Sequence, residues 1–167
     1  IALYDLEIPR YILPKSLQQE ASRKLSFSVL KTMSVAQKLY EAGKITYMRT
    51  DSISLSETAR DAAKTAIIDQ YGDKYAKERQ FKTKSGLAQE AHEAIRPTDI
   101  NRAPAKMRQY LNDEQFKLYE MIWKRTLACQ MSPAKFDAVS VDLAVGSEAN
   151  LFRATGQTLV FAGFIAV

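Results

Sequence analysis

A short segment of the chain gathers the residue types needed for nucleophilic attack on phosphorus. Ile45–Ser52 (ITYMRTDS) contains a tyrosine, an arginine, a carboxylate and three aliphatic hydroxyl groups. The ordinary tyrosine pKa of about 10 leaves only about 0.1% phenolate at neutral pH, so an attacking tyrosine needs a proton acceptor or a cation beside its oxygen. In extended chain Tyr47, Arg49 and Asp51 share one side, and the guanidinium could hold a phosphate bidentately. A tyrosine in a strand usually packs, so this segment alone leaves packing and catalysis both open.

A second polar segment, Glu90–Pro97 (EAHEAIRP), contains the single histidine of the chain. His92 and Arg96 are four residues apart and would share one face of a helix, where they could clamp a phosphate. They could equally form a pair on a solvated face. A lone histidine cannot build a metal site without ligands of other types, so this segment does not decide the function by itself.

Composition excludes several classes of protein. One Cys and one His in 167 residues exclude an internal disulfide framework and a Cys/His zinc cluster. The sequence contains no phosphate-binding glycine loop and no GxSxG motif. Cys129 lies in an apolar helical stretch and is expected to pack. The longest apolar run, Leu159–Val167, is too short to span a bilayer, and we expect neither a membrane span nor an export signal.

Charge and chain ends add two weaker indications. The net charge of +5 favours a polyanionic partner such as nucleic acid, but only mildly. The chain begins at Ile1 and stops inside an apolar run at Val167. We therefore expect a piece of a longer protein, which can hold half of an active site.

Two helices are predicted to precede the tyrosine. Capping-box spacing at Ser16 and Gln19 predicts a helix that starts at Leu17. Residues 26–28 interrupt it, and a second helix follows to residue 42. Residues 44–51 are β-branched and aromatic, which suits a short strand or an extended loop.

Three further helical stretches are predicted in the middle of the chain. Ser54 and Glu57 form a capping box for a helix that Gly72 closes. Residues 73–88 are polar and basic and indicate a surface loop, and residues 89–95 indicate a short helix. Asn112 and Gln115 cap the clearest helix, which Pro133 prevents from continuing.

Both ends of the chain favour β-structure. Residues 1–13 are β-leaning but interrupted by a proline, and alternation of period two starts at Phe136. Turns at residues 146–150 and at Gly156 predict an antiparallel meander. The fold class is therefore α+β, with a mainly helical domain (15–133) inserted into a β domain built from residues 1–14 and 134–167.

Taken together, the two polar segments resemble one known family. KITYMRTDS (44–52), QEAHEAIRPTD (89–99) and KLYEMIWKRTLACQMSPAKFD (117–137) are similar, in this order and spacing, to signature stretches of bacterial type IA DNA topoisomerases. The resemblance covers nearly all of residues 16–167. The first two motifs together are highly specific to that family.

The resemblance implies a role for each polar residue. Tyr47 would attack one DNA strand and keep its 5′ phosphate as a transient phosphotyrosine, while Arg49 would stabilise the charge of the scissile phosphate. His92 and Arg96 would contact DNA near the site, and Asp51 and Ser52 would shape the loop. Strand passage and resealing would relax negative supercoils without ATP.

The resemblance also implies partners outside the chain. The family binds Mg²⁺ and holds its remaining catalytic groups in an N-terminal Toprim domain, which nothing here resembles, so no metal is expected on this chain and the fragment alone should not cleave. The helical domain would be the mobile part, with winged-helix-like character, and the β segments would form the arch that acts as its hinge. The partner would be single-stranded DNA in negatively supercoiled duplex, in the cytoplasm with the nucleoid.

One alternative class remains. Residues 17–47 also suit a winged-helix DNA-binding module without enzymatic activity. Polar residues of the second helix would then read bases, with Lys31, Ser34, Gln37 and Lys38 as candidates. That hypothesis leaves Tyr47 and the second motif unexplained. A purely structural domain, in which every motif packs, is the third and weakest alternative.

Overall fold

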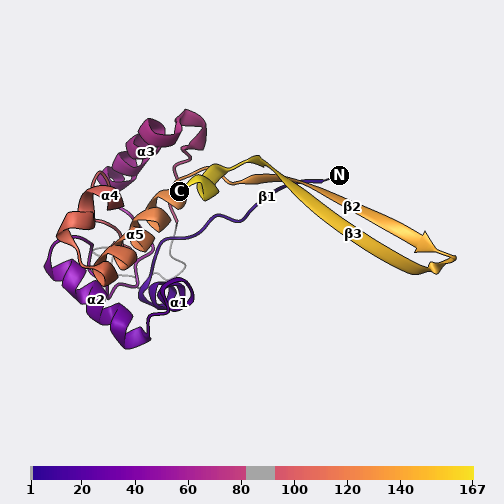
Figure 1. Ribbon diagram of the computed structural model, residues 1–167. Coiled ribbons are helices and arrows are strands. Elements are labelled where there is room, and N and C mark those ends of the chain that lie inside the picture. Colours follow the sequence, from indigo (N-terminus) through magenta and orange to yellow (C-terminus); the bar gives the residue numbers. More distant parts are fainter. Residues whose placement is uncertain (1, 82–92) are drawn as a thin grey trace.

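The computed structural model describes residues 2–81 and 93–167, which form a helical body and a long β-hairpin that extends away from it (Figure 1). The α-helices of this part are α1 (Pro14–Leu25), α2 (Val29–Glu41), α3 (Glu57–Tyr71), α4 (Pro104–Met107) and α5 (Asp113–Ala128). Single 3-10 turns are η1 (Asp73–Tyr75), η2 (Arg108–Tyr110) and η3 (Gly163–Ala166). The strands are β1 (Ala2–Asp5), β2 (Lys135–Val145) and β3 (Ser147–Phe161). The α+β class is confirmed.

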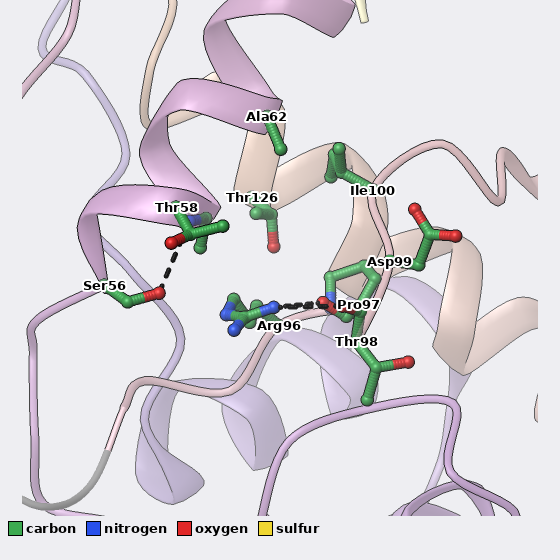
Figure 2. A pocket seen from close by; sticks show the side chains of 10 residues that line it. Ser56, Thr58, Ala62, Arg96, Pro97, Thr98, Asp99, Ile100 and Thr126 are labelled. Carbon is green, nitrogen blue, oxygen red and sulfur yellow. Dashed lines mark hydrogen bonds between the residues drawn. The ribbon is translucent and has the colours of Figure 1, made fainter.

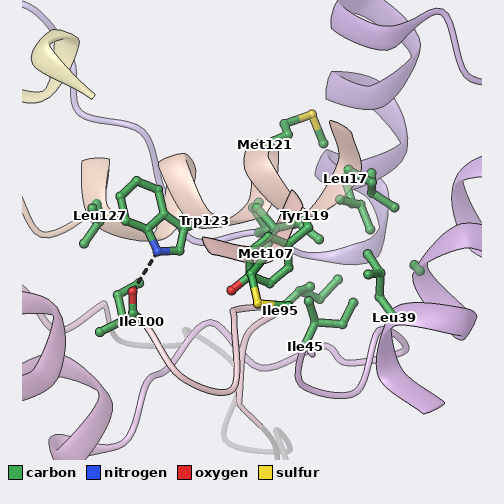
Figure 3. Close-up of a cluster of buried hydrophobic side chains, with 14 of the residues drawn as sticks. Leu17, Leu39, Ile45, Ile95, Ile100, Met107, Tyr119, Met121, Trp123 and Leu127 are labelled. Carbon is green, nitrogen blue, oxygen red and sulfur yellow. Dashed lines mark hydrogen bonds between the residues drawn. The ribbon is translucent and has the colours of Figure 1, made fainter. Parts of the chain in front are cut away.

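Helix α5 is the centre of the helical body. It packs against α1, α2, α3 and α4, and its Leu118, Ile122 and Leu127 are fully buried. Trp123 donates its indole N–H to the carbonyl of Ile100 at 2.8 Å, which ties the chain before α4 to the core (Figure 3). Burying one such side chain is worth about 1.5–3 kcal/mol, so the buried face of α5 contributes several kcal/mol.

The predicted cap of α5 is confirmed, and two others are wrong. Asn112 accepts from the amide of Gln115 at 2.9 Å, and the Gln115 side chain accepts from the Asn112 amide at 3.1 Å. Helix α1 starts at Pro14 instead of Leu17, because proline suits the first helical position and Ser16 bonds back to Leu13 from the third.

The cap of α3 is Ser56, whose hydroxyl accepts from the amide of Ala59, and not Ser54. Ser54 is engaged elsewhere. Its hydroxyl lies 2.8 Å from that of Ser52, and its carbonyl accepts from the amide of Ala94.

The predicted surface loop after Gly72 is more ordered than expected where the structure describes it. After the turn of η1, Ala76 forms a β-bridge with Met131. The Arg79 guanidinium donates to the carbonyls of Cys129 and Met131. Residues 76–81 therefore lie against the C-terminal end of α5, because the arginine satisfies carbonyls that the helix leaves unpaired.

The two ends of the chain meet in one antiparallel sheet, in the order β1-β2-β3. The expected use of both ends is confirmed, but the predicted meander is wrong. Strand β3 continues through Gly156, which pairs with Val139, and the chain turns at Gly146 alone. Residues after Phe161 form η3 instead of a further strand.

The hairpin has one apolar and one polar face. Val139, Val141 and Leu143 of β2 pair with Gly156, Ala154 and Phe152 of β3, so their side chains share a face. On the other face Asp142 accepts two hydrogen bonds from Arg153, at 2.6 and 2.9 Å. The apolar face is exposed in this chain. Among the described residues no helix combines the length and apolarity needed to cross a membrane.

We expect Gly163→Ala to destabilise the chain where the hairpin joins the helical body. Gly163 has φ +50°, and a Cβ there would overlap the backbone of Ser132 and Pro133. A left-handed conformation alone costs a non-glycine residue about 1–2 kcal/mol. Thermal unfolding should therefore start several degrees lower. The matched control is Gly156→Ala, which meets no atom within 4 Å and should leave the melting temperature nearly unchanged.

We expect Cys129 to be unreactive in the folded chain. The thiol is fully buried beside Tyr11, Leu55 and Ala94, and burial raises its pKa to about 12. At pH 8 the thiol is therefore protonated and shielded from solvent. A disulfide reagent such as Ellman's reagent should label Cys129 only after denaturant is added. Rapid labelling of the native chain would contradict this placement.

Candidate active site

A surface groove of about 470 Å³ lies between α2 and the segment that carries Tyr47. It is lined by Met33, Ser34, Gln37, Tyr47, Met48 and Arg49. The groove brings together the tyrosine and the arginine that the sequence singled out as a nucleophile and a phosphate ligand. Ser34 and Gln37, the polar residues of the winged-helix alternative, line the same groove.

The tyrosine segment is an extended loop whose side chains alternate in burial. Tyr47, Arg49 and Asp51 are exposed, whereas the intervening Met48, Thr50 and Ser52 are buried. The expectation that the first three share one side is consistent with this alternation. Only an isolated bridge forms here, between Ile45 and Pro97, so the loop alternative is correct and the strand alternative is wrong.

Tyr47 is half-exposed, at 38% of its full surface, and its ring stands edge-on to Tyr40 of α2. The ring centroids are 5.2 Å apart and the planes meet at 63°. Within the described residues, no hydrogen bond engages the Tyr47 hydroxyl. The ring is therefore held by an aromatic contact, and the half-exposed side chain lines the groove.

The backbone beside Tyr47 is pinned to the second motif by Thr46. The Thr46 amide donates to the carbonyl of Arg96 at 2.9 Å, and the Arg96 amide donates to Thr46 Oγ1 at 2.9 Å. Thr46 Oγ1 in turn donates to the carbonyl of Ala94 at 2.8 Å. Because Met48 is buried on the other side of the tyrosine, Tyr47 is fixed from both of its neighbours.

The Arg96 side chain points away from this pairing into a separate pocket of about 170 Å³ between α3 and α5 (Figure 2). Its guanidinium donates to Glu93 Oε2 at 2.5 and 3.1 Å and to the carbonyls of Pro97 and Thr98 at 2.9 and 3.3 Å. In this arrangement the guanidinium orders residues 93–98. Its predicted contact with a phosphate stays a prediction.

Glu93 connects this pocket to the start of α3. Its Oε1 accepts from the amide of Ser56 at 2.6 Å. Partial burial raises the pKa of Glu93, but the hydrogen bonds from Ser56 and the neighbouring Arg96 outweigh it and hold the pKa below its ordinary value. The carboxylate is therefore ionised at neutral pH, and it clamps the Arg96 guanidinium.

The remaining predicted site residues have different surroundings. Ser52 is buried and bonds to Ser54, so it stabilises the loop after the groove, and Asp51 is exposed. His92 lies outside the described residues. The predicted helix over 89–95 is wrong at its described end, because residues 93–95 are not helical and Ile95 bridges Ile12.

Two residues of the site were missed by sequence reasoning, Thr46 and Glu93. Each makes a contact with a residue far away in the chain, Thr46 with Ala94 and Glu93 with Ser56, and local patterns do not identify such partners. The alternation of Ile45–Ser52 places Thr46 opposite Tyr47, which hints that its hydroxyl faces the protein. In residues 2–81 and 93–167, no group of three or more His, Cys, Asp or Glu side chains could hold a metal ion.

Comparison with known proteins identifies relatives of this chain. A family model described as DNA topoisomerase matches residues 8–167. The chain is 50% identical over 163 residues to DNA topoisomerase 1 of Xylella fastidiosa (strain Temecula1 / ATCC 700964) and 51% identical over 162 residues to that of Rickettsia bellii (strain RML369-C). Each alignment covers 91% of this chain and 20% of the relative.

A solved structure shows the same fold. Full-length topoisomerase I from Thermotoga maritima superposes with a TM-score of 0.87 at 37% identity, over 99% of this chain and 28% of that one. The chain thus spans about a fifth of the length of the curated relatives. From the family match over residues 8–167 and these identities, the chain belongs to the bacterial type IA DNA topoisomerases.

Proposed function

We propose that this chain supplies the nucleophile for transient cleavage of a single DNA strand, and that Tyr47 is that nucleophile. The observation that carries the proposal is the groove that the exposed residues Tyr47 and Arg49 line together. Family membership supports DNA as the substrate.

The chemistry is a transesterification. Tyr47 Oη loses its proton and attacks the phosphorus, the bond from phosphorus to the 3′ oxygen breaks, and that oxygen leaves as a hydroxyl after taking up a proton. The new phosphotyrosine conserves the ester, so reversal by the 3′-hydroxyl reseals the strand without ATP. Between the two steps another strand passes through the gap, which relaxes negative supercoils.

The other polar residues support this step. Arg49 stabilises the negative charge that develops on the phosphate, because a guanidinium fits two phosphate oxygens at once. Asp51 and Ser52 order the loop that the DNA strand follows. His92 and Arg96 contact the DNA near the site, which for Arg96 requires exchange of its bond to Glu93 for one to phosphate.

The rest of the enzyme supplies what the described residues do not. Residues 15–133 form the helical domain that carries Tyr47, and residues 1–14 and 134–167 form the hinge, which the meeting of both chain ends in one sheet supports. Ligands for Mg²⁺ belong to the Toprim domain of the same polypeptide, so this chain alone does not cleave. The enzyme acts in the cytoplasm, at the nucleoid.

The winged-helix alternative shares the surface but not the chemistry. Ser34 and Gln37 line the groove and could contact DNA without any bond being broken. Lys31 forms an ion pair with Glu114 at 2.6 Å, and it would have to give up this pair in order to contact a base. The two hypotheses differ in whether DNA becomes covalently attached.

We expect Tyr47→Phe to abolish covalent capture of DNA and to leave folding unchanged. The change removes one exposed hydroxyl, so the free energy of unfolding should move by less than about 0.5 kcal/mol. The assay mixes the chain with a separately made Toprim-containing N-terminal piece, Mg²⁺ and single-stranded DNA labelled at its 3′ end. Label that migrates with the denatured chain reports the 5′-phosphotyrosine.

The matched control for this assay is Tyr40→Phe. It removes a hydroxyl from the ring that contacts Tyr47 and keeps the edge-on contact. This variant should capture DNA as the unchanged chain does. If neither the unchanged chain nor the Tyr40→Phe variant is labelled, each change is tested in the full-length enzyme by relaxation of supercoiled DNA. Normal relaxation by the Tyr47→Phe enzyme would refute the assignment of Tyr47 as the nucleophile.

We expect Thr46→Val in the full-length enzyme to slow cleavage at saturating DNA by about 10- to 100-fold, because a misplacement of about 1 Å can cost 100-fold. Valine keeps the shape of threonine but loses the hydroxyl that joins the two motifs. Thr46→Ser restores that hydroxyl and should recover most of the rate. Single-turnover cleavage gives the rate, and filter binding gives the DNA affinity, which should stay unchanged. A Val variant with normal cleavage would contradict the positioning role.

A further inference from the structure

A second groove, of about 270 Å³, lies on the helical body and collects positive charge. It is lined by Lys44, Arg102, Lys106, Met107 and Tyr110, and we call it the Lys44 groove. One wall is the loop that leads into the tyrosine segment, and the other is formed by α4 and η2. None of its residues belongs to the groove around Tyr47.

The charge of the Lys44 groove is mostly uncompensated. Among the described residues neither Lys44 nor Lys106 forms an ion pair, whereas Arg102 is paired with Asp99 at 3.4 Å and stays half-exposed. Three cationic side chains therefore line the groove, and only one of them is paired with a carboxylate, that of Asp99. Such a site attracts an anion that can be contacted from two walls, and a phosphodiester meets that requirement.

An aromatic ring completes the groove. Tyr110 is 67% exposed, although it lies next to the buried residues Met107 and Leu111. A flat ring exposed beside cations is the arrangement by which proteins hold single-stranded nucleic acid, since bases stack on the ring while the cations follow the backbone. Every base has such a face, so this contact does not depend on sequence.

The walls of the Lys44 groove are fixed by hydrogen bonds. The amide of Thr98 donates to the Lys44 carbonyl at 3.1 Å, and the Tyr119 hydroxyl donates to the Arg102 carbonyl at 2.6 Å. Lys44 precedes Tyr47 by three residues, so their backbones are at most about 11 Å apart. The two grooves are therefore close along the chain, and one DNA strand would have to span only about that distance to meet both.

We propose that the Lys44 groove binds a backbone phosphate and an adjacent base of the same DNA strand that Tyr47 attacks. Lys44, Arg102 and Lys106 hold the phosphate, and Tyr110 stacks on the base. This inference rests on the proposed function. It adds a second point of attachment for the strand, which would fix which phosphate lies at Tyr47.

The test measures binding of a fluorescein-labelled oligothymidylate to this chain by anisotropy over a range of salt concentrations. The double variant Lys44→Gln with Lys106→Gln should bind more weakly. The magnitude of the slope of log K against log salt should fall by about 0.7, since both lysines hold one phosphate and each phosphate contact on single strands contributes about 0.7. Tyr110→Leu should weaken binding at least about fivefold, and Tyr110→Phe should bind as the unchanged chain does.

The matched control is Lys15→Gln with Lys64→Gln, which removes the same charge from exposed positions on α1 and α3. It should leave the salt slope nearly unchanged. An equal loss in both double variants would mean that overall charge alone binds DNA, and would overturn the proposal. Unchanged binding by the Lys44 double variant would overturn it in favour of an acidic protein partner for the groove.

Anisotropy and the covalent-capture assay together separate this proposal from the assignment of Tyr47. Tyr47→Phe should bind the oligonucleotide normally because it keeps the Lys44 groove intact. If the Lys44→Gln with Lys106→Gln variant keeps the salt slope of the unchanged chain while covalent capture depends on Tyr47, only the proposed role of the Lys44 groove is refuted. If the Tyr47→Phe chain still captures DNA covalently while the lysine double variant shows the smaller salt slope, only the assignment of Tyr47 as the nucleophile is refuted.

Discussion

The pairing of Thr46 with residues 94–96 is the contact on which the site depends. It joins two segments that are about fifty residues apart in the sequence, and it uses backbone and side-chain hydrogen bonds together. Ile45 and Met48, on either side of Thr46 and Tyr47, are buried in the core. The tyrosine therefore sits on a loop that behaves as a rigid element, although the loop has no regular secondary structure. A reactive group gains from such support because its position is set before a substrate arrives.

The Glu93–Arg96 pair extends the same support in a second direction. Glu93 accepts from the amide of Ser56, the N-cap residue of α3, and Arg96 donates to the carbonyls of Pro97 and Thr98. A carboxylate and a guanidinium that satisfy each other cost less to bury than either alone. The second motif thus has a structural part, seen in these contacts, besides the part in DNA binding proposed for it. For Arg96 both parts use the guanidinium, which would exchange Glu93 for phosphate on DNA binding.

The sequence predicted elements well where the signal is local, and poorly where it is not. Asn112 and Gln115 cap α5 as expected because a capping box involves only neighbouring residues. Ser54 fails as a cap because Ser52 and Ala94 already engage it. Gly156 fails as a turn because the pairing of β2 with β3 overrides the preference of one glycine. In the site, Tyr47 and Arg49 meet in one groove because their spacing is local. Thr46 instead bonds to Ala94 and Arg96, and Glu93 joins its neighbour Arg96 to the distant Ser56.

The hairpin of β2 and β3 is a long projection whose base, where Pro133 meets Gly163, is closely packed. We call this base the stem. Gly163 lies against Pro133, and the amide of Phe164 donates to the carbonyl of Ser132 at 2.9 Å, so both strands leave the end of α5 together. Strand β3 has 15 residues, which at about 3.3 Å each give an arm of roughly 50 Å. Rotation of the stem by about 10° would then displace the tip by roughly 9 Å for an arm of that length. A shift of α5 too small to disturb its packing is thus amplified into a movement several times larger at the tip.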